Sequence, residues 1–389
     1  MGKQVISENN IEIRLYRNLQ ELSKIGPAWD LLAQTMPHKS PLMTYSWLSA
    51  FFECCITEKQ SWFVIASFHA GQLIAVLPTV VIPYRFLGLS RYYLTTPNDD
   101  QTLSIDMVMD STNTHAKDQL NLAQMMIEKA LEITPRADFF EFYRIDGIST
   151  AFKQLYQNKT LSCIQEYCES GASLEIPENY QNYRSSLKKN FKANLNKAKN
   201  KLSRHSDVKY IINNSNAIDI TNLDVFADVE HACWKGTEGT SIKSNIKTME
   251  FYRKLSAKLA SKGWLRFHIL ELEGKAIAAN LAIDFMGSTL LWKLGYDEAH
   301  RRYSPGGMLM EKLIESASSN GNITQIDLMT SQDWYDNWNM QRRPFYNYWL
   351  FKPSLIGTFL SFAKALKIRF KEITVLRKIK NTLLNKTKR

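Results

Sequence analysis

Two stretches of the chain share a pattern in which two runs of apolar residues flank a short polar turn. The first, WFVIASFHAGQLIAVLPTVVI, begins at Trp62, and the second, WLRFHILELEGKAIAANLAIDF, begins at Trp264. Each turn ends in a glycine, Gly71 or Gly274, which suits a turn position with positive φ. The pattern therefore predicts one β-hairpin in each half of the chain.

The residues around the two hairpins predict the same further elements in the same order. Before each hairpin lie two helical patterns with large aromatic residues, namely Trp29, Trp47 and Phe51 in the first half and Trp234 and Phe251 in the second. After each hairpin come a strand, a helix and another strand, the last two at 115–132 and 138–143 in the first half and at 305–319 and 325–329 in the second. The shared order favours an internal duplication over a chance likeness of two α/β segments.

These elements predict the fold class and the domain organisation. Helices combined with an antiparallel hairpin and further strands are typical of an α/β fold, here an α+β mixed sheet with helices packed on it. A chain of 389 residues is too long for one ordinary core, so about two domains are expected. We expect similar domains at 1–178 and 179–352, followed by a basic, amphipathic helical tail at 353–389.

Two segments carry the positive charge of the chain. The formal net charge is +11, but residues 183–204 hold eight Lys or Arg and no acid, and residues 353–389 hold ten and a single acid, Glu372. Because these segments together carry +17, the remainder of the chain carries −6, and the basicity belongs to two elements.

Residues 183–204 predict one amphipathic helix with a cationic face. The apolar positions that follow helical spacing are Leu187, Phe191, Leu195, Ala198 and Leu202. The cationic face is either solvated or meets an anionic ligand or surface, and the spacing leaves both interpretations open.

The tail at 353–389 is apolar, amphipathic and cationic. One interpretation is interfacial binding to anionic lipid, because hydrophobic burial and charge attraction add. The other is a helix docked on the body with a frayed basic end. No run of ~18 apolar residues predicts a membrane span, and the first residues lack the apolar segment of a signal peptide. The five cysteines, odd in number and without metal spacing, favour reduced thiols. We expect a cytoplasmic protein, peripheral at the inner face of the membrane if the tail binds lipid.

The segment GYDEAHRRYSPGGMLMEKLIESA, residues 295–317, carries the most informative chemistry. A predicted strand at 288–296 runs into a loop and then a helix, where Ser304 suits the N-cap and Pro305 the first turn. The following Gly306 allows close approach of a ligand to the backbone.

The same loop gathers features that bind phosphate. A helix start offers unpaired N–H groups and the positive end of the dipole. Besides Gly306 it carries Gly307, and the side chains of Arg301 and Arg302, just ahead, can add charge-assisted hydrogen bonds. We therefore predict a pyrophosphate-binding loop; the alternative is a plain loop before a helix that begins with proline.

With these motifs the chain resembles the GNAT acetyltransferase superfamily. Its second half is similar to the CelD-like, BioF2-like branch associated with cellulose and exopolysaccharide biosynthesis, and its tandem layout is similar to that of Fem-type peptidoglycan-bridge aminoacyltransferases. The resemblance spans most of residues 12–350 and is strongest in the segments 184–204, His231-x-x-Trp234-x-Gly236-x-x-Gly239, 271–280 and Tyr303-Ser304-Pro305-Gly306. It implies two tandem GNAT-like domains, the first of them degenerate, an acyl-CoA co-substrate such as acetyl-CoA, and no metal.

The chain departs from these relatives at three places. The usual GNAT cofactor loop is Q/R-x-x-G-x-G/A, whereas Arg302 here precedes Gly306 with one residue more between them. CelD-type relatives often carry Tyr-Lys shortly after the last core strand, whereas this chain has Tyr335-Asp336. The first half has no counterpart of the SPGG loop, so we expect it to shape the substrate cleft without holding a second cofactor.

The resemblance also implies the chemistry. In GNAT enzymes an amine or hydroxyl attacks the thioester carbonyl, and a backbone N–H on the strand before the loop, here 288–296, stabilises the oxyanion. A base takes the incoming proton and an acid, often Tyr, protonates the departing thiolate. The candidate residues are therefore Tyr335, His231 and Asp333 for catalysis and Arg301, Arg302, Ser304, Gly306 and Gly307 for the cofactor.

Other interpretations of these residues remain open. Tyr335 lies between two tryptophans and can serve packing, and His231 can be structural. Further carboxylates near the expected cleft are Glu230 and Asp297. In the first half, Asn98-Asp99-Asp100 and Asp106 either face the same cleft or, for the first three, form a loop turn.

Three functions fit the sequence. The first is an acyl-CoA-dependent N- or O-acyltransferase with a small-molecule or saccharide acceptor of the cell envelope or of an exopolysaccharide. The second is a Fem-type aminoacyltransferase, in which the helix at 183–204 would contact tRNA phosphates and binding would weaken steeply with salt. The third is a non-catalytic GNAT-like binding module at the membrane. A sequence-specific DNA binder is not expected, because no nucleic-acid motif occurs.

Overall fold

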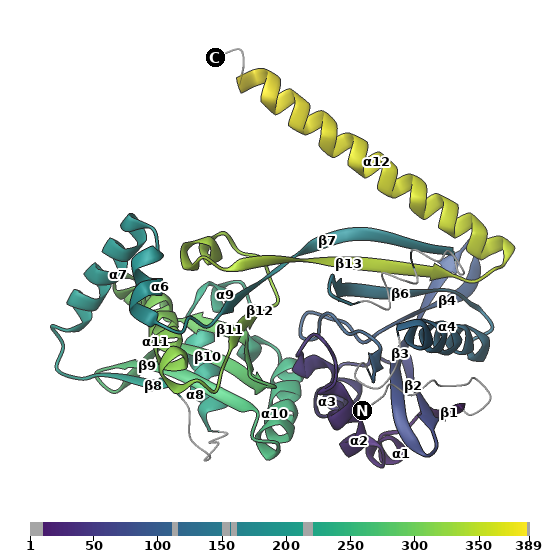
Figure 1. Ribbon diagram of the computed structural model, residues 1–389, viewed down its shortest axis with the longest axis horizontal. Coiled ribbons are helices and arrows are strands. Elements are labelled where there is room, and N and C mark those ends of the chain that lie inside the picture. Colours follow the sequence, from purple (N-terminus) through teal and green to yellow (C-terminus); the bar gives the residue numbers. More distant parts are fainter. Residues whose placement is uncertain (1–10, 111–115, 150–155, 157–161, 213–220, 387–389) are drawn as a thin grey trace.

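The computed structural model describes residues 11–110, 116–149, 156, 162–212 and 221–386 (Figure 1). One continuous sheet runs through the molecule, and helices cover both of its faces. The strand order is β1-β2-β3-β4-β6-β13-β7-β12-β11-β10-β9-β8, and the short strand β5 pairs with β3.

The first half of the chain forms one end of this sheet. Its elements are β1 (Ile11–Tyr16), α1 (Leu19–Ser23), α2 (Gly26–Ala33), α3 (Tyr45–Cys54), β2 (Ser61–His69), β3 (Gln72–Phe86), β4 (Leu89–Thr95), β5 (Val108–Met109), α4 (Ala116–Ile133), β6 (Ala137–Asp146) and β7 (Ser162–Glu175).

The second half repeats this order. Its elements are α6 (Tyr180–Ser186), α7 (Lys189–Leu202), β8 (Val208–Ile212), α8 (Asn222–His231), α9 (Trp234–Thr237), α10 (Ile246–Ser261), β9 (Leu265–Leu272), β10 (Lys275–Phe285), β11 (Ser288–Tyr296), the 3-10 turn η4 (Glu298–Tyr303), α11 (Pro305–Asn320), β12 (Gln325–Leu328), the 3-10 turn η5 (Asp333–Trp338), β13 (Gln341–Phe351) and α12 (Leu355–Lys386).

The predicted duplication of elements is therefore confirmed. Both hairpins, β2–β3 and β9–β10, are antiparallel, and their turn glycines, Gly71 and Gly274, have φ values of 80° and 74°. In each half the strand after the hairpin pairs in parallel with the strand that follows the next helix, β4 with β6 and β11 with β12. The fold is a mixed α/β sheet, as expected.

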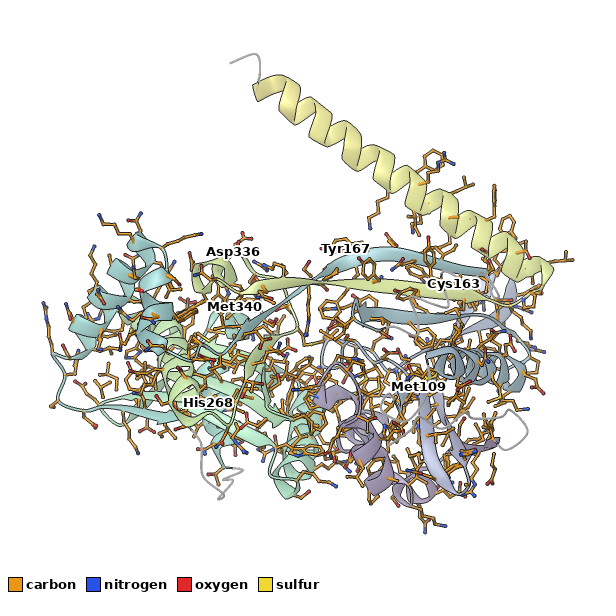
Figure 2. All side chains as sticks on the ribbon, in the orientation of Figure 1. Met109, Cys163, Tyr167, His268, Asp336 and Met340 are labelled. Atoms are coloured by element: carbon orange, nitrogen blue, oxygen red, sulfur yellow. The ribbon has the colours of Figure 1, made fainter. Side chains whose placement is uncertain are left out.

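Two long strands connect the halves. β13 pairs with β6 on one side and with β7 on the other, and the end of β7 pairs with β12. Each half thus completes its sheet with a strand that follows the other half in the chain. Figure 2 shows Met340 and Cys163 near the two ends of this β7–β13 ribbon and Tyr167 along it. The division at residues 178 and 179 stays a prediction. Each of the two strands β7 and β13 pairs with a strand from the other side of that division.

The hydrophobic core has three parts. One lies under α4 in the first half, and one under α7 and α11 in the second. The third is shared, because α3 and α10, which hold corresponding positions in the two halves, pack on each other. At its centre Trp47 lies 6.3 Å from Phe251 and 5.1 Å from Trp292 between ring centroids. This apolar contact fixes the relative position of the two halves.

The predicted single basic helix is wrong in one respect. The segment forms two helices, because Leu187 and Lys188 have extended backbone with ψ values of 152° and 134°. Leu187 points into the core, as do Leu195, Ala198 and Leu202 of α7. The apolar periodicity located the buried face but did not reveal the break.

None of the helices described is long and apolar enough to cross a membrane.

Candidate active site

The two parallel strands of the second half separate and leave a cleft. β11 and β12 pair only from Ser288 to Leu290. Beyond Leu290, the edge of β11 that faces β12 is open and lines a cleft of about 740 Å³. A bulge where Trp292 is inserted, opposite the step from Leu281 to Ala282 of β10, lies at the same place. The cleft therefore exposes the backbone of a central strand, which is otherwise hydrogen-bonded on both sides.

The N-terminus of α11 forms one wall of this cleft through Gly306 and Gly307. The first N–H of the helix with a partner is that of Met308, which donates to Ser304 O at 3.0 Å, so the N–H groups of both glycines lack helical acceptors. A Cβ at Gly307 would lie 2.9 Å from Ser304 Oγ, whereas one at Gly306 would meet nothing closer than 3.8 Å. The helix start thus presents open donors to the cleft.

Ser304 lines the cleft and occupies the predicted N-cap position of α11, but its side chain does not cap the helix. Its φ of 48° places it in the left-handed region, and its side chain makes no capping hydrogen bond. The reason is that Ser304 also ends η4, where its N–H donates to Arg301 O at 3.0 Å. An N-cap residue usually caps a helix with its side chain from an extended backbone. The left-handed backbone of Ser304 turns its hydroxyl away from that position.

The two neighbouring arginines differ in position. Arg301 lines the cleft. Arg302 does not, because its Nη2 donates to the hydroxyl of Tyr303 at 2.7 Å and its guanidinium lies 4.7 Å from the centroid of that ring. Lys201 of α7 donates to Arg302 O at 3.2 Å. A phosphate-binding role therefore fits Arg301, and packing fits Arg302.

Tyr335 reaches the cleft from η5, after the last short strand of the second half. It is 3% exposed, its hydroxyl lies 3.0 Å from Thr330 Oγ1, and both residues line the cleft. Burial raises the pKa of Tyr335, so the phenol stays protonated at neutral pH. Tyr335 also packs in the core beneath α11, as the packing interpretation expects, and its catalytic role stays a prediction.

His231 and Asp333 lie outside the lining of the cleft. His231 is exposed at the end of α8, where its Nδ1 lies 2.9 Å from Ser241 Oγ, and Asp333 is exposed in η5. The motif around His231 has a structural explanation, because a Cβ at Gly236 would lie 1.8 Å from His231 O. Helix α8 ends at His231, and α9 is a separate turn.

A cluster of charged residues that the sequence did not single out lies on the open edge of β11. Lys293 and Lys235 both line the cleft. Lys235 Nζ donates to Glu230 Oε1 at 2.7 Å, and the other oxygen of buried Glu230 accepts from the N–H of Ile242 at 2.8 Å. Burial, together with repulsion from Lys235, lowers the pKa of Lys293 to about 8. Glu230 was noted in the sequence only as one of several carboxylates.

Close packing brings this cluster together. α8 lies directly on β11 at Gly295, where a Cβ would come within 3.0 Å of Glu230 Cα. Glu230 and Lys293 are far apart in sequence and on different types of element, so no spacing rule links them. The only local signal was Gly295, and glycine in a strand often marks a close approach of backbone.

Hydrogen bonds link the first half to Trp292 of the cleft lining. Trp292 Nε1 donates to the hydroxyl of Tyr252 at 3.0 Å, and that hydroxyl donates to Gln101 Oε1 at 2.8 Å. Asp99 forms the predicted turn, accepting the N–H of Gln101 at 2.8 Å, and its charge raises the pKa of nearby Lys293, against the effect of burial.

Asp106 does not face this cleft. It is buried, its carboxylate accepts from the N–H of Met107 at 2.6 Å, and burial raises its pKa to about 7. Asp297 is also structural, since it caps η4 through the N–H of Ala299 and pairs with Lys275 Nζ at 2.7 Å.

The basic helices α6 and α7 contact elements that form the cleft. Phe191 of α7 lines the cleft and lies 4.9 Å from the Trp338 ring in an edge-on contact. Arg184 of α6 pairs with Glu311 of α11 at 2.7 Å. The cationic stretch is therefore attached to the same helix whose N-terminus opens into the cleft.

The site offers acid–base and anion-binding groups. In the part of the chain that is described, no three His, Cys, Asp or Glu side chains gather so as to hold a metal ion. The cleft combines open N–H donors and an arginine at one end with a partly buried amine and a protonated phenol along its length. Such a set can bind an elongated anionic ligand and move protons beside it.

Comparison with known proteins gives the family of the second half. Residues 189–337 match the family model described as Acetyltransferase (GNAT) domain. No curated protein sequence matches this chain. The matched segment contains all the residues that line the cleft except Trp338, and with them both lysines and the α11 loop.

Several solved structures share the fold of nearly the whole chain. FemX is 9% identical with a TM-score of 0.60, and the match covers 90% of this chain and 100% of FemX. A conserved protein from Bacteroides thetaiotaomicron is 12% identical with a TM-score of 0.53, covering 88% and 100%. The L-PGS structure from Bacillus licheniformis is 10% identical with a TM-score of 0.51, covering 90% and 97%. The chain therefore has the GNAT fold in a tandem, Fem-like layout.

Proposed function

Because the second half carries a GNAT acyltransferase domain, we propose that this protein transfers an acyl group from acyl-CoA, acetyl-CoA first, to an amine or hydroxyl. The observation that supports this most is the α11 N-terminus, where the open N–H groups of Gly306 and Gly307 meet Arg301 at one end of the cleft.

These three residues would hold the diphosphate of CoA. The donors are backbone groups fixed by the helix, so binding needs little reordering of the protein. A Cβ at Gly306 would meet nothing closer than 3.8 Å, so the absence of a side chain there leaves space in front of these donors. Bound in this way, acyl-CoA supplies an activated thioester to the open edge of β11.

Lys293 is the group best suited to accept the proton of the acceptor. It lines the cleft, and its lowered pKa leaves a fraction of the amine neutral at neutral pH. Burial disfavours protonation of Lys293 most, and Lys235 adds to this effect, whereas Glu230, the partner of Lys235, opposes it. Unpaired N–H groups between Leu291 and Tyr296 are candidates for stabilising the oxyanion.

Tyr335 is the candidate acid. Its raised pKa keeps the proton on the phenol until the thiolate leaves, and Thr330 orients the hydroxyl. Ser304 and Arg302 take supporting positions in the loop. His231 and Asp333, which do not line the cleft, are not assigned to proton transfer.

The acceptor enters, in this proposal, from the side of the first half. Gln101 of the first half is linked through Tyr252 to Trp292 of the lining, and Trp234 and Trp334 add exposed aromatic surface to the lining. Aromatic and polar lining suits a saccharide or another small polar acceptor. The CelD-like, BioF2-like resemblance favours a cell-envelope or exopolysaccharide acceptor.

An aminoacyl-tRNA donor is the second candidate. The observation that favours it is the row of lysines on α7, the helix whose Phe191 lines the cleft, and FemX shares the overall fold. A tRNA held there would be released by salt, because binding would depend on phosphate contacts.

One experiment separates the two donors. Purified protein is titrated with acetyl-CoA and, separately, with aminoacylated tRNA at several salt concentrations. We expect saturable binding of acetyl-CoA and transfer of its acyl group to a panel of amines and amino sugars. Binding of aminoacyl-tRNA with aminoacyl transfer and no binding of any CoA species would refute the acyl-CoA proposal.

A further inference from the structure

An exposed apolar surface lies at the opposite end of the molecule from the cleft, on two segments that are far apart in sequence. We propose that this surface, formed by the β3–β4 hairpin tip and the outer face of α12, binds an anionic lipid membrane. This inference does not depend on the donor or acceptor of the acyl transfer.

The first part of the surface is a stripe on α12. Its outward apolar residues are Leu355, Phe359, Phe362, Leu366 and Phe370. At about 100° per residue these positions fall within an arc of roughly 80°, along about 22 Å of helix. Leu355 is 93% exposed and Phe362 is 65% exposed.

The opposite face of α12 is held to the body. Lys371 Nζ lies 2.7 Å from Glu166 Oε1, and Lys364 Nζ lies 3.4 Å from the centroid of the Trp349 ring. Ser361 Oγ lies 2.7 Å from Ser162 Oγ. These contacts to β7 and β13 fix the rotation of the helix, so the apolar stripe faces away from the sheet. Figure 1 shows α12 beginning beside β4 and rising obliquely away from the β7–β13 ribbon.

The second part is the tip of the β3–β4 hairpin. Leu87 is 87% exposed and Leu89 is 57% exposed. The tip adjoins the stripe, because the rings of Phe86 and Phe359 lie 5.9 Å apart between centroids. Both segments thus form one continuous apolar surface.

Leu87 occupies a turn position that a leucine seldom adopts, and it is more exposed than its counterpart in the other half. Leu87 has φ 48° and Gly88 has φ 82°, a pair of turn positions that asparagine and glycine favour. A leucine there is strained and also leaves its side chain in water. The corresponding position in the β10–β11 turn is Met286, which is also apolar, has φ 52° and is 45% exposed. The leucine therefore stabilises neither the turn nor the core.

The charges around the surface favour an anionic partner. Residues 353–371 contain four Lys or Arg and no acid. Lys367 and Arg369 are exposed, and Arg85 is exposed on β3 beside the tip. Arg91 and Tyr84, also near the tip, are engaged by buried Asp138. An apolar stripe with cationic flanks complements the interface of an anionic bilayer, where burial and charge attraction add.

The test uses the full chain and sedimentation with vesicles of phosphatidylcholine alone or mixed with phosphatidylglycerol. We expect binding to the mixed vesicles that weakens at raised salt. Phe362→Ser/Leu366→Ser should lower the partition coefficient at least about tenfold, which corresponds to 1.4 kcal/mol. Lys367→Glu/Arg369→Glu should remove the preference for phosphatidylglycerol. Leu31→Ser, at a 65% exposed residue of α2, is the matched control and should bind as the unmodified chain does.

A variant that folds better and binds less makes the test independent of misfolding. Leu87→Asn relieves the turn, so thermal stability should hold or rise while binding to mixed vesicles falls. The proposal is overturned if the unmodified chain does not bind, if Leu31→Ser weakens binding as much as the stripe variant, or if Lys367→Glu/Arg369→Glu keeps its lipid preference. It is overturned too if lipid-free protein is a dimer that Phe362→Ser/Leu366→Ser dissociates, since the stripe then belongs to a second copy.

Discussion

Replacing Arg301 by alanine should weaken CoA binding, whereas replacing its neighbour Arg302 should not. The two residues are adjacent and chemically identical, but only Arg301 lines the cleft, and Arg302 is held by Tyr303. The pair is therefore a matched test of the α11 loop as the diphosphate site.

The expected magnitude follows from exposure. A hydrogen bond to a charged group contributes about 1.5–3 kcal/mol. Arg301 is exposed, so water screens the contact and the lower end applies. A loss of about 1.4 kcal/mol raises the dissociation constant of acetyl-CoA about tenfold. At a free ligand concentration of about 100 dissociation constants, stabilisation of the folded protein falls from about 2.7 to about 1.4 kcal/mol.

Isothermal titration calorimetry measures both variants with CoA and with pantetheine, which lacks the diphosphate. Arg301→Ala should lose affinity for CoA only, and Arg302→Ala should stay within about twofold for both ligands. An equal loss in the two variants, or a loss of pantetheine affinity in Arg301→Ala, would show that the arginine acts through the fold of the loop. No loss in Arg301→Ala would refute the placement of the diphosphate.

Three further predictions concern the cleft and its support. With Lys293 as the base, kcat/KM should rise about tenfold from pH 7 to pH 9, because the neutral amine is the active form and its pKa is about 8. Lys293→Met should lose this pH dependence and about 10²–10⁴-fold of the rate, and a variant that keeps the same rise of kcat/KM with pH would exclude Lys293 as the base. Tyr335→Phe should lower kcat with little change in acetyl-CoA affinity, since the ring still packs while the proton donor is gone; steady-state kinetics decide this, and a change confined to KM would assign Tyr335 to packing alone. Gly236→Ala should destabilise the protein by about 1–3 kcal/mol in urea unfolding, because the new Cβ would meet His231 O at 1.8 Å; unchanged stability would mean that the turn between α8 and α9 shifts freely.

The local elements could be predicted because their signals lie within a few residues. The alternation around Gly71 and Gly274 and the proline at the start of α11 depend on nearest neighbours, and the structure confirms both hairpins and the helix start. The same locality explains the errors. Serine is a favoured N-cap residue, but the preceding turn η4 sets the backbone of Ser304 to φ 48°, and its side chain does not cap α11. The break between the two basic helices at Leu187 was missed because it leaves the apolar periodicity intact.

The candidate site divides in the same way. The loop with Arg301, Gly306 and Gly307 could be predicted from the sequence, because the residues that would bind phosphate lie close together in the chain. The sequence did not show that Arg301 lines the cleft and Arg302 does not, because this depends on which of the two side chains Tyr303 binds. The lowered pKa of Lys293 depends on Lys235 and on burial between the halves, and neither follows from the residues beside it.

The sequence by itself determined the repeated order of elements, the mixed α/β class, the two basic segments and the position of the α11 loop. Only the tertiary structure decided that β13 lies between β6 and β7, that α3 and α10 join the halves, and that the apolar face of α12 points outward beside the β3–β4 tip. The physical reason is range. Periodicity and turn chemistry act between neighbours in the chain, whereas strand insertion, burial and the direction of a helix face depend on contacts between residues that are hundreds of positions apart.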